Sequence, residues 1–445
     1  MKKVITYGTY DLLHYGHLRL LERAKELGDY LIVGVTADDF DISRGKINVQ
    51  QSLMERIEAV RSTGLADEII IEEYEGQKID DIKNLGVDIF TVGSDWTGKF
   101  DYLKEYCEVV YLKRTKGVSS SELRTKEREL RIGLVGEEII VKKFATECQY
   151  VNGVTLSGVW TFNKDILADK LDGYQPIESF ESLVDQSDAL YIASHPSKHY
   201  EQIKYALERK KHVLFESPIA LSFQQGAELY DLASANSCVL YEGIKTAYST
   251  AYARMILLAK TGKIGEIISV DATCTSLKTL DFQNKKQMAH EWNSLTAWGP
   301  TTMLPIFQLL GTSFQSKHIL SRIVPDTDNY DEFSKISFVY PRAVASMKVG
   351  KGVKSEGELI ISGTKGYIYV PAPWWKSDYF EIRYENPADN KRYFYQLDGE
   401  GIRYEVASFV KSISNQHIAF ISKDISLCIA QIMEDYENAI DLTKI

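Results

Sequence analysis

Two histidines near the start of the chain, His14 and His17, flank Gly16 in the segment His-Tyr-Gly-His. Imidazole N–H groups can donate hydrogen bonds to phosphate oxygens, and a glycine lets the backbone approach an oxygen-rich ligand. The sequence therefore predicts a site for the phosphates of a nucleoside triphosphate, in which neither histidine needs to act as a base. The alternative interpretation is that the two histidines only cap a helix.

The elements around this pair fit a phosphate site. The segment Lys3 to Tyr7 alternates and is rich in β-formers, whereas Leu18 to Leu27 carries apolar residues at helical spacing. The histidines are therefore expected at a strand-to-helix junction. Free N–H groups and the positive end of the helix dipole attract an anion at such a junction.

Further motifs follow in order along about the first 125 residues. They are GTYDLLHYGH, RGK at Arg44 to Lys46, MERIEAVR at Met54 to Arg61, VGSDWTGKFD at Val92 to Asp101, and RTKGVSSS at Arg114 to Ser121. Together they resemble the glycerol-3-phosphate cytidylyltransferase family. The resemblance implies a Rossmann-like α/β nucleotidyltransferase that joins CTP to a polyol phosphate and releases pyrophosphate.

The same resemblance assigns roles to residues. His14 and His17 contact the triphosphate, Lys46 reaches the phosphates from a loop, and Arg114 holds the outgoing pyrophosphate. Asp95 and Trp96 are expected near the nucleoside. The full set implied around the nucleotide is Thr9, Tyr10, Asp11, Gly16, Asp95, Trp96, Thr115, Ser119, Ser120 and Ser121.

The chemistry agrees with a site made of histidines, cations and hydroxyl groups. A substrate phosphate is already anionic, so it can attack the α-phosphorus without a base, and the protein has to align the reactants and neutralise charge. Mg²⁺ is expected, because the triphosphate carries more charge than these side chains can balance. Asp11 is the candidate metal group, and forming the turn is its alternative role. Arg44 and Lys46 could equally be a solvated loop pair.

One departure concerns the acceptor. Members of the family carry a second arginine eight positions after the one at Arg56, and this chain has Gly64 there. We expect Arg56 and Arg61 to bind the acceptor, with solvent exposure as the alternative for Arg61. Glycerol 3-phosphate is the default acceptor, and glycerol 2-phosphate, erythritol phosphate and ribitol phosphate remain open.

Composition limits the remaining possibilities. The chain has 445 residues, a net charge of −10 and five scattered cysteines without metal-ligand spacing. This charge disfavours nucleic acid as a partner, and the cysteines indicate reduced thiols rather than a zinc site. No run approaches the ~20 apolar residues of a membrane span, and the first residues do not form an export leader. We expect a cytoplasmic homo-oligomer, a dimer, that binds CTP and a polyol phosphate.

The chain is long enough for more than one domain. We predict three: a cytidylyltransferase domain at 1–126, a Rossmann domain at 127–250, and an α+β domain at 251–445 with a largely antiparallel sheet. The second and third resemble the Gfo/Idh/MocA oxidoreductases. RIGLVG at Arg131 to Gly136 and HYEQIKYALERKKHVLFESPIAL at His199 to Leu221 carry this resemblance.

The residues that make that family dehydrogenases are replaced here. The second glycine of the cofactor loop falls on Glu138, and a small position falls on Val141. The lysine of a Glu-Lys-Pro motif is Ser217, and the expected Asp and His fall near Met303 and Phe307. NAD(P) is therefore not expected to bind, and this half is interpreted as an inactive relic that dimerises or binds a regulator.

Three alternatives stay open. The second half could be an active NAD(P)-dependent reductase that makes the polyol phosphate, and the first half could use ATP instead of CTP. Finally, some residues of the second half could line a residual pocket. His290 and Trp292 are candidates for that pocket, whereas core, cap or packing roles are expected for His195, His199, His212, Tyr241, Tyr248 and Tyr252.

Overall fold

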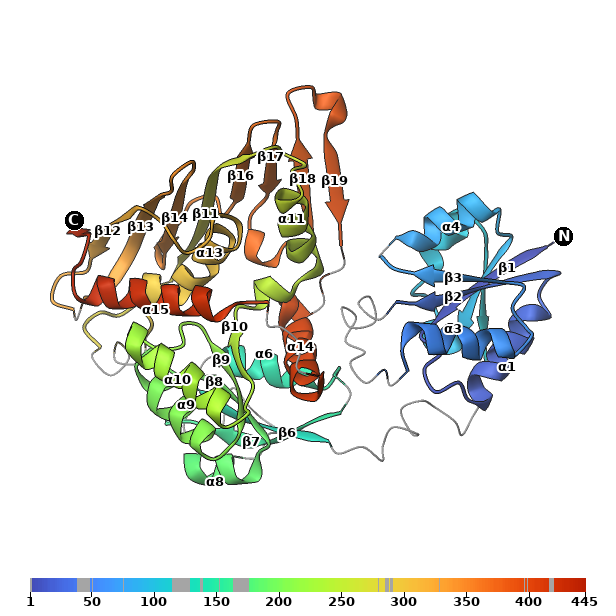
Figure 1. Ribbon diagram of the computed structural model, residues 1–445, viewed down its shortest axis with the longest axis horizontal. Helices are drawn as coiled ribbons and strands as arrows, with labels where there is room; N and C mark the ends of the chain where they lie inside the picture. The colour runs from blue at the N-terminus through green and yellow to red at the C-terminus, as the bar shows by residue number, and fades with distance from the viewer. Residues whose placement is uncertain are drawn as a thin grey trace. The chain divides into compact units, whose positions relative to one another are not determined.

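The computed structural model divides the chain into two compact units (Figure 1). The first comprises Met1–Glu129 with Val151–Gly153, and the second comprises Leu130–Tyr150 with Val154–Ile445. The structure describes residues 2–37, 49, 51–74, 76–113, 129–136, 139–151, 153–162, 176–278, 280–284, 288, 291–327, 329–395, 397, 399–415 and 420–445, with the backbone alone for 414–415.

The first unit is a doubly wound parallel sheet with the strand order β3-β2-β1-β4-β5. Its elements are β1 (Lys3–Gly8), α1 (Tyr15–Lys25), β2 (Tyr30–Thr36), α3 (Leu53–Ser62), β3 (Glu68–Glu72), α4 (Gln77–Leu85), β4 (Ile89–Gly93) and β5 (Glu108–Leu112), with 3₁₀ turns at Ser94–Trp96 and Asp101–Glu105. The chain order reverses between β1 and β4, and ligands of such sheets bind beyond the carboxyl ends of the strands at this point.

Apolar residues cover both faces of this sheet, as buried parallel strands require. On one face, Val4 and Val33 pack against Leu21 of α1 and Val60 of α3. On the other face, Ile5, Ile32 and Phe90 pack against Ile82 of α4. Because both faces are used for the core, the strand ends are where polar residues can gather.

The second unit begins with another parallel sheet, ordered β10-β9-β8-β6-β7. Its elements are β6 (Leu130–Gly136), α6 (Ile139–Cys148), β7 (Val154–Trp160), α8 (Phe180–Gln186), β8 (Ala189–Ala193), α9 (His199–Glu208), β9 (His212–Glu216), α10 (Phe223–Ala235) and β10 (Leu240–Gly243). Gly136, at the end of β6, has φ +145°, and a Cβ there would lie 2.6 Å from the Ala193 carbonyl oxygen, so this position requires glycine.

A mixed, largely antiparallel sheet completes the second unit, in the order β19-β18-β17-β16-β11-β14-β13-β12-β20 with β15 beside β11. Its strands are β11 (Ile267–Leu277), β12 (Ser316–Ile323), β13 (Asp331–Val339), β14 (Val344–Gly350), β15 (Gly352–Val353), β16 (Leu359–Gly363), β17 (Tyr367–Val370), β18 (Tyr379–Arg383), β19 (Lys391–Phe394) and β20 (Leu442–Lys444). The helices are α11 (Thr250–Lys260), α13 (Ser294–Leu310), α14 (Ile402–Asn415) and α15 (Lys423–Glu437).

Helices connect this sheet to the parallel one. In Figure 1, α11 and α13 lie along the large sheet, while α14 lies beside α6. Helix α15 packs against both α10 and α13, so the two sheets of the second unit share one continuous structure. Within the described part of the chain, no helix combines the length and apolar character that a membrane crossing needs.

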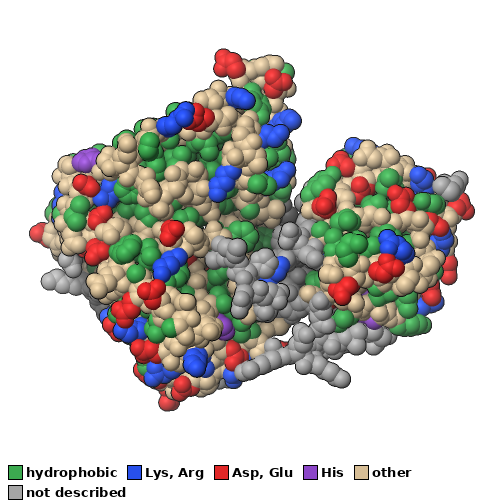
Figure 2. Space-filling model, in the orientation of Figure 1, with side chains coloured by type: hydrophobic (Ala, Val, Ile, Leu, Met, Phe, Trp, Pro, Cys, Tyr) green, Lys and Arg blue, Asp and Glu red, His purple; other side chains and the backbone are tan. Residues whose placement is uncertain are grey.

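The predicted fold class is confirmed: two parallel Rossmann-like sheets precede a largely antiparallel one. The segment Lys3 to Tyr7, expected to be rich in β structure, is part of strand β1. On the face drawn in Figure 2, acidic and basic side chains are interspersed rather than gathered into one basic field. Strand β12 was not predicted, because SKHILSRI mixes charged and apolar residues without clear alternation.

Candidate functional site

The predicted phosphate site lies at the switch point of the first sheet. The loop after β1 leads into α1, and the loop after the adjacent strand β4 forms the 3₁₀ turn at Ser94–Trp96. Parallel pairing puts both loops at the same edge of the sheet. Asp95 and Trp96 are exposed at that edge, and the ring of Trp96 contacts Phe100.

His14 and His17 are directly in contact. Their rings stack with centroids 3.9 Å apart and an interplanar angle of 17°, and His17 also meets the Tyr10 ring edge-on. His14 is the N-cap of α1: its Nδ1 accepts a hydrogen bond from the Gly16 amide at 3.0 Å. The capping role considered from the sequence is therefore real for His14, and it fixes the orientation of the ring.

The loop between β1 and the histidines is strained. Tyr10 and Leu12 both adopt left-handed φ angles, +54° and +47°, which residues other than glycine rarely take. Gln51, just before α3, holds this loop through two hydrogen bonds. Its backbone N–H donates to Asp11 Oδ1 at 3.0 Å, and its side-chain oxygen accepts from the backbone N–H of Leu12 at 2.8 Å. The loop is thus locked in place before any ligand arrives.

Arg56 makes the second brace. Its side chain is fully buried and donates to three carbonyl groups: Thr9 and Thr36 at 2.7 and 2.8 Å, and Gln51 at 3.1 Å. These carbonyls come from the loop after β1, the end of β2 and the start of α3. In the structure Arg56 therefore has a positioning role, and the expected contact with the acceptor stays a prediction.

The other predicted residues of this loop are also buried. Tyr10 is 1% exposed and its ring belongs to the core, so only its backbone can face a ligand. Thr9 and Asp11 are buried as well, and Asp11 has one carboxylate oxygen bonded to the Gln51 amide. The turn-forming role of Asp11 is thus present in the structure.

Arg61 faces solvent. It forms an ion pair with Glu58 on the exposed side of α3. The helix ends immediately afterwards, and Gly64 has a left-handed φ of +66° with open space within 4 Å of the position that a Cβ would take. A left-handed residue stops the helix, so the chain turns away where the family has its second arginine.

Several predicted residues lie outside the described part of the chain. They are Arg44, Lys46, Arg114, Thr115, Ser119, Ser120, Ser121, Glu138 and His290. Their roles stay predictions. The sequence pattern did not single out Gln51, since nothing local separates it from an ordinary loop residue.

A buried ion pair was also missed. Lys78 of α4 pairs with Glu72, which ends β3, and Thr36 at the end of β2 donates to the same carboxylate at 2.9 Å. The Lys78 ammonium lies 4.7 Å from the centroid of the Tyr7 ring. Buried charges require such pairing, and this pair fixes the edge of the sheet next to the candidate site.

The donor set for a metal is small. Among the residues described, no three His, Cys, Asp or Glu side chains converge in a way that could hold an ion. Asp11 is the single predicted carboxylate in the loop, and one of its oxygens is already bonded. This fits Mg²⁺ bound mainly through nucleotide phosphates and water, with at most one protein ligand.

In the second unit, the positions at which the sequence comparison expected dehydrogenase residues hold other residues, which make structural contacts. The Ser217 hydroxyl donates to the buried Glu242 carboxylate, whose pKa burial raises to about 7. Met303 and Phe307 are buried in α13, and Phe307 packs on Phe338 of the large sheet. The three positions thus carry a serine, a methionine and a phenylalanine, and whether this unit transfers hydride stays a prediction.

Two carboxyl groups, Glu216 at the end of β9 and Glu405 in α14, are buried near each other, and their charges interact. Burial raises the pKa of Glu405 in α14, and the charge of Glu216 raises it further, while Lys245 opposes the shift. Burial likewise raises the pKa of Glu216, which accepts a hydrogen bond from Tyr191. Gly243 is required beside them, since a Cβ there would lie 2.6 Å from Glu405 Oε1.

The histidines of the second unit have structural roles. His199 is fully buried, and its two ring nitrogens lie 2.8 and 2.7 Å from the Pro218 and Ser194 carbonyl oxygens. His195 caps a short 3₁₀ turn, and Trp292 contacts both rings edge-on. Trp292 therefore covers the carboxyl end of β8.

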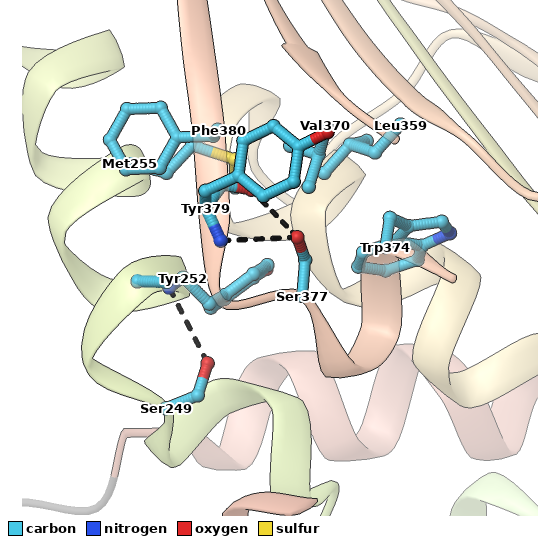
Figure 3. A pocket seen from close by; sticks show the side chains of 10 residues that line it. Ser249, Tyr252, Met255, Leu359, Val370, Trp374, Ser377, Tyr379 and Phe380 are labelled. Carbon is cyan, nitrogen blue, oxygen red and sulfur yellow. Dashed lines mark hydrogen bonds between the residues drawn. The ribbon is translucent and has the colours of Figure 1, made fainter. Parts of the chain in front are cut away.

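Figure 3 shows a small, partly open pocket between α11 and the strands β16 to β18. It is lined by Ser249, Ala251, Tyr252, Met255, Leu359, Val370, Trp374, Ser377, Tyr379 and Phe380. Ser249 accepts a bond from the Tyr252 amide, and Ser377 bonds to the backbone of Tyr379. The pocket therefore offers mainly apolar and aromatic surface.

Comparison with known proteins separates the two units. Residues 5–126 match the cytidylyltransferase-like family. The glycerol-3-phosphate cytidylyltransferase of Bacillus spizizenii is 52% identical over 124 residues, which are 28% of this chain and 95% of that protein. The enzyme of the same name from Staphylococcus aureus is 49% identical over 128 residues, 28% of this chain and 93% of that protein.

Residues 130–244 match the oxidoreductase family with an NAD-binding Rossmann fold. Glucose-6-phosphate 3-dehydrogenase of Bacillus subtilis is 28% identical over 142 residues, 32% of this chain and 41% of that protein. The crystal structure of KijD10, a 3-ketoreductase from Actinomadura kijaniata in complex with NADP and TDP-benzene, has a TM-score of 0.63 at 17% identity. It covers 71% of this chain and 99% of its own, and at this identity it shows the fold alone.

The brace at Arg56 gives a first prediction. Arg56→Lys keeps the charge but cannot reach three carbonyl groups, so buried acceptors are left unsatisfied at a cost of about 1–3 kcal/mol. We expect faster amide hydrogen exchange in residues 9–13 and around Gln51. Arg61→Lys on the exposed side of the same helix is the matched control and should change stability by less than about 0.5 kcal/mol. Equal effects of both substitutions would contradict the assigned role.

The buried carboxyl groups give a second prediction. A folded-state pKa above the ordinary 4.5 means that the native state holds its proton more tightly than the unfolded chain does. The contribution of Glu405 to the free energy of unfolding is therefore fully present below pH 4.5. It is lost as the pH rises through the folded-state pKa of this group.

Glu405→Gln cannot ionise, so its melting temperature should match the wild type near about pH 5 and exceed it increasingly toward about pH 8. Calorimetry of the second unit's transition measures this, with Glu208→Gln at the exposed end of α9 as control. A constant difference across the pH range would show that Glu405 is not the titrating group.

Proposed function

Because the chain belongs to the cytidylyltransferase family through residues 5–126, and is therefore a nucleotidyltransferase, we propose that it transfers the cytidylyl group of CTP to a polyol phosphate. Glycerol 3-phosphate is the proposed acceptor and pyrophosphate the leaving group. The observation that carries this proposal is the stacked pair His14 and His17 at the start of α1, on the switch-point edge of the sheet.

The cap hydrogen bond determines which atom of His14 can serve the nucleotide. Since Nδ1 accepts from the Gly16 amide, the neutral imidazole carries its proton on Nε2. The Nδ1 atom of His17 is buried, so the outer nitrogen of this ring is also Nε2. Both rings can therefore present an N–H group to phosphate oxygens, together with the dipole of α1.

The reaction needs alignment more than acid–base chemistry. An oxygen of the acceptor phosphate forms a bond to the α-phosphorus of CTP, and the bond from that phosphorus to the bridging oxygen breaks. The electron pair leaves with pyrophosphate. The histidines would stabilise the charge that builds up on the phosphate oxygens, and Lys46, Arg114 and Ser119 to Ser121 are proposed to hold the leaving group.

Mg²⁺ is proposed to accompany the nucleotide, where it would neutralise phosphate charge. Asp11 is the residue of this chain that would face it. The hydrogen bond from the Gln51 backbone N–H to Asp11 Oδ1 keeps Asp11 in place. The loop and the proposed metal environment therefore depend on the same hydrogen bond. CTP, the polyol phosphate and Mg²⁺ would thus meet at the β1 and β4 ends.

The proposed acceptor, glycerol 3-phosphate, follows from the family and does not rest on a contact with Arg61. Because Arg61 points into solvent and Gly64 ends α3, neither supplies the cation that relatives place there. The product, a CDP-polyol, would feed synthesis of a teichoic-acid-like or capsular polymer. A homodimer in the cytoplasm is the proposed working form.

The second unit is proposed not to transfer hydride. The support is Ser217, where the family pattern has a lysine, together with its hydrogen bond to Glu242 and the apolar residues Met303 and Phe307. A serine cannot supply the charge or the proton of an ammonium group. The alternative, a reductase that prepares the polyol phosphate, is favoured by the fold that this unit shares with NADP-bound 3-ketoreductases.

The central prediction separates catalysis from capping. His14→Asn keeps a good N-cap but removes the imidazole, so it should leave the melting temperature nearly unchanged. We expect it to lower the rate of pyrophosphate release from CTP and glycerol 3-phosphate by about 10²-fold or more, as loss of a preorganised donor does. His17→Ala should have an effect of similar size, while His318→Ala in strand β12 of the second unit is the control.

Near-full activity of His14→Asn would mean that the histidine only caps the helix. The same assay with ATP in place of CTP tests the alternative nucleotide, and a panel of polyol phosphates tests the acceptor. A preference for ATP would contradict the cytidylyl assignment while leaving the site intact.

For the second unit, titration of the full chain with NADH and NADPH is expected to give no saturable binding at sub-millimolar concentrations. The reason is that the described residues around Ser217 and Met303 offer no group for the nicotinamide or a keto substrate. Saturable binding, together with reduction of a keto phosphate, would establish the reductase alternative. His14→Asn is the control, because it leaves the second unit unchanged.

A further inference from the structure

Three lysines of the second unit converge on one carboxylate. Lys143 of α6 lies 3.0 and 2.9 Å from the two oxygens of Glu400, and Lys245, just after β10, lies 2.7 Å from one of them. Lys376, from the 3₁₀ turn before β18, lies 3.6 Å away. These cations come from three separate parts of the fold, so only the tertiary structure brings them together.

The turn that delivers Glu400 is strained. Gly399, Glu400 and Gly401 all have left-handed φ angles, +57°, +54° and +94°. The flanking glycines are required by space as well, because a Cβ on Gly401 would lie 2.8 Å from the Lys245 carbonyl oxygen. A residue with a side chain rarely adopts this conformation, and such strain persists only where the surrounding structure holds it.

The charges around this turn do not balance locally. Among the residues that the structure describes at this turn, three ammonium groups face the carboxylate of Glu400, which retains one-third of its side-chain exposure. Partial burial opposes ionisation of Glu400, but hydrogen bonds from Lys245 and Lys143 lower its pKa to about 2. The carboxylate is therefore charged at every relevant pH and still leaves an excess of cations.

The charged groups that the structure describes nearby reduce this excess but do not remove it. Glu147 is paired with Arg403 at 3.0 Å next to Gly399. Behind Lys245 lie Glu216 and Glu405, whose pKa values burial raises. Glu405 favours the neutral form, whereas Glu216, with a pKa of about 6, is mostly ionised at neutral pH, so the three lysines meet two negative charges, Glu400 and Glu216. A dianion with three acceptor oxygens would satisfy the three lysines better than one carboxylate does.

We propose that Lys143, Lys245 and Lys376 form a binding site for the phosphate group of a phosphomonoester, and that Glu400 occupies this site until such a ligand displaces it. The site lies in the second unit and does not depend on cytidylyl transfer in the first. It gives the oxidoreductase-like half a ligand of stated chemistry without any hydride transfer.

The test is lysine acylation of the full chain with an N-hydroxysuccinimide ester, read residue by residue by mass spectrometry, with inorganic phosphate as the probe. The side chains of Lys143 and Lys376 are 42% and 40% exposed, so the reagent can reach them and their acylation can be measured directly. Phosphate should protect both. In Glu400→Gln, the phosphate concentration for half-protection should fall about fivefold, because a competing ion pair of up to about 1 kcal/mol is gone.

Lys204, paired one-to-one with Glu228 at 2.7 Å, is the internal control, and Glu228→Gln is the matched variant. Potassium chloride at equal ionic strength controls for screening. Lys376→Gln should weaken the protection of Lys143, which keeps the test valid if Glu400→Gln melts early. Protection no greater than at Lys204, equal protection by chloride, or an unchanged half-protecting concentration in Glu400→Gln would overturn the proposal.

Discussion

The candidate active site depends on one buried guanidinium. Arg56 joins carbonyl groups from three segments far apart in the sequence, and each of these segments borders the switch point of the first sheet. A single lysine or an apolar side chain could not connect them, because only the planar fork of arginine presents several donors at fixed angles. The strained loop at Tyr10 and Leu12 can exist because this brace and Gln51 hold it.

From this constraint the electrostatics of the site follow. With the loop fixed, His14 caps α1 and stacks on His17, so two imidazoles are oriented before a ligand binds. Preorganised donors need no reorganisation when charge develops on a phosphate, which is the main way in which a site without a catalytic base can accelerate transfer. The strain in the loop is thus connected to the proposed chemistry by geometry.

The sequence predicts this site well where the information is local. A β-rich strand, the His-x-Gly-His segment and an amphipathic helix are adjacent in the chain, so the strand end, the helix start and the imidazoles could be placed together. The role of Arg56 could not be predicted, because its partners are carbonyl groups of Thr9 and Thr36, which have no side-chain signature. For the same reason Gln51 was not recognised, and the stacking of the two histidines could be seen only in the three-dimensional structure.

The second unit shows how a shared fold can carry a different electrostatic character. In the first sheet, the switch-point edge is built from hydrogen-bond donors around a fixed loop. In the second, the edge behind β9 and β10 holds buried carboxyl groups, Glu216, Glu242 and Glu405, two of them on strands that end beside the family's motif. Burial raises the pKa values of all three, so their ionisation is opposed by desolvation and depends on their hydrogen bonds and on Lys245.

Lys245 connects these buried carboxyl groups with the exposed cluster around Glu400, since its charge acts on both. A change at the exposed carboxylate would therefore alter the balance at Glu405 in α14, the helix that packs on α6. Long-range coupling needs such a group with two sets of partners, and interactions in a low-dielectric interior make it effective. Lys245 thus bonds directly to the partly exposed Glu400 and also lowers the pKa of the buried Glu405 through its charge.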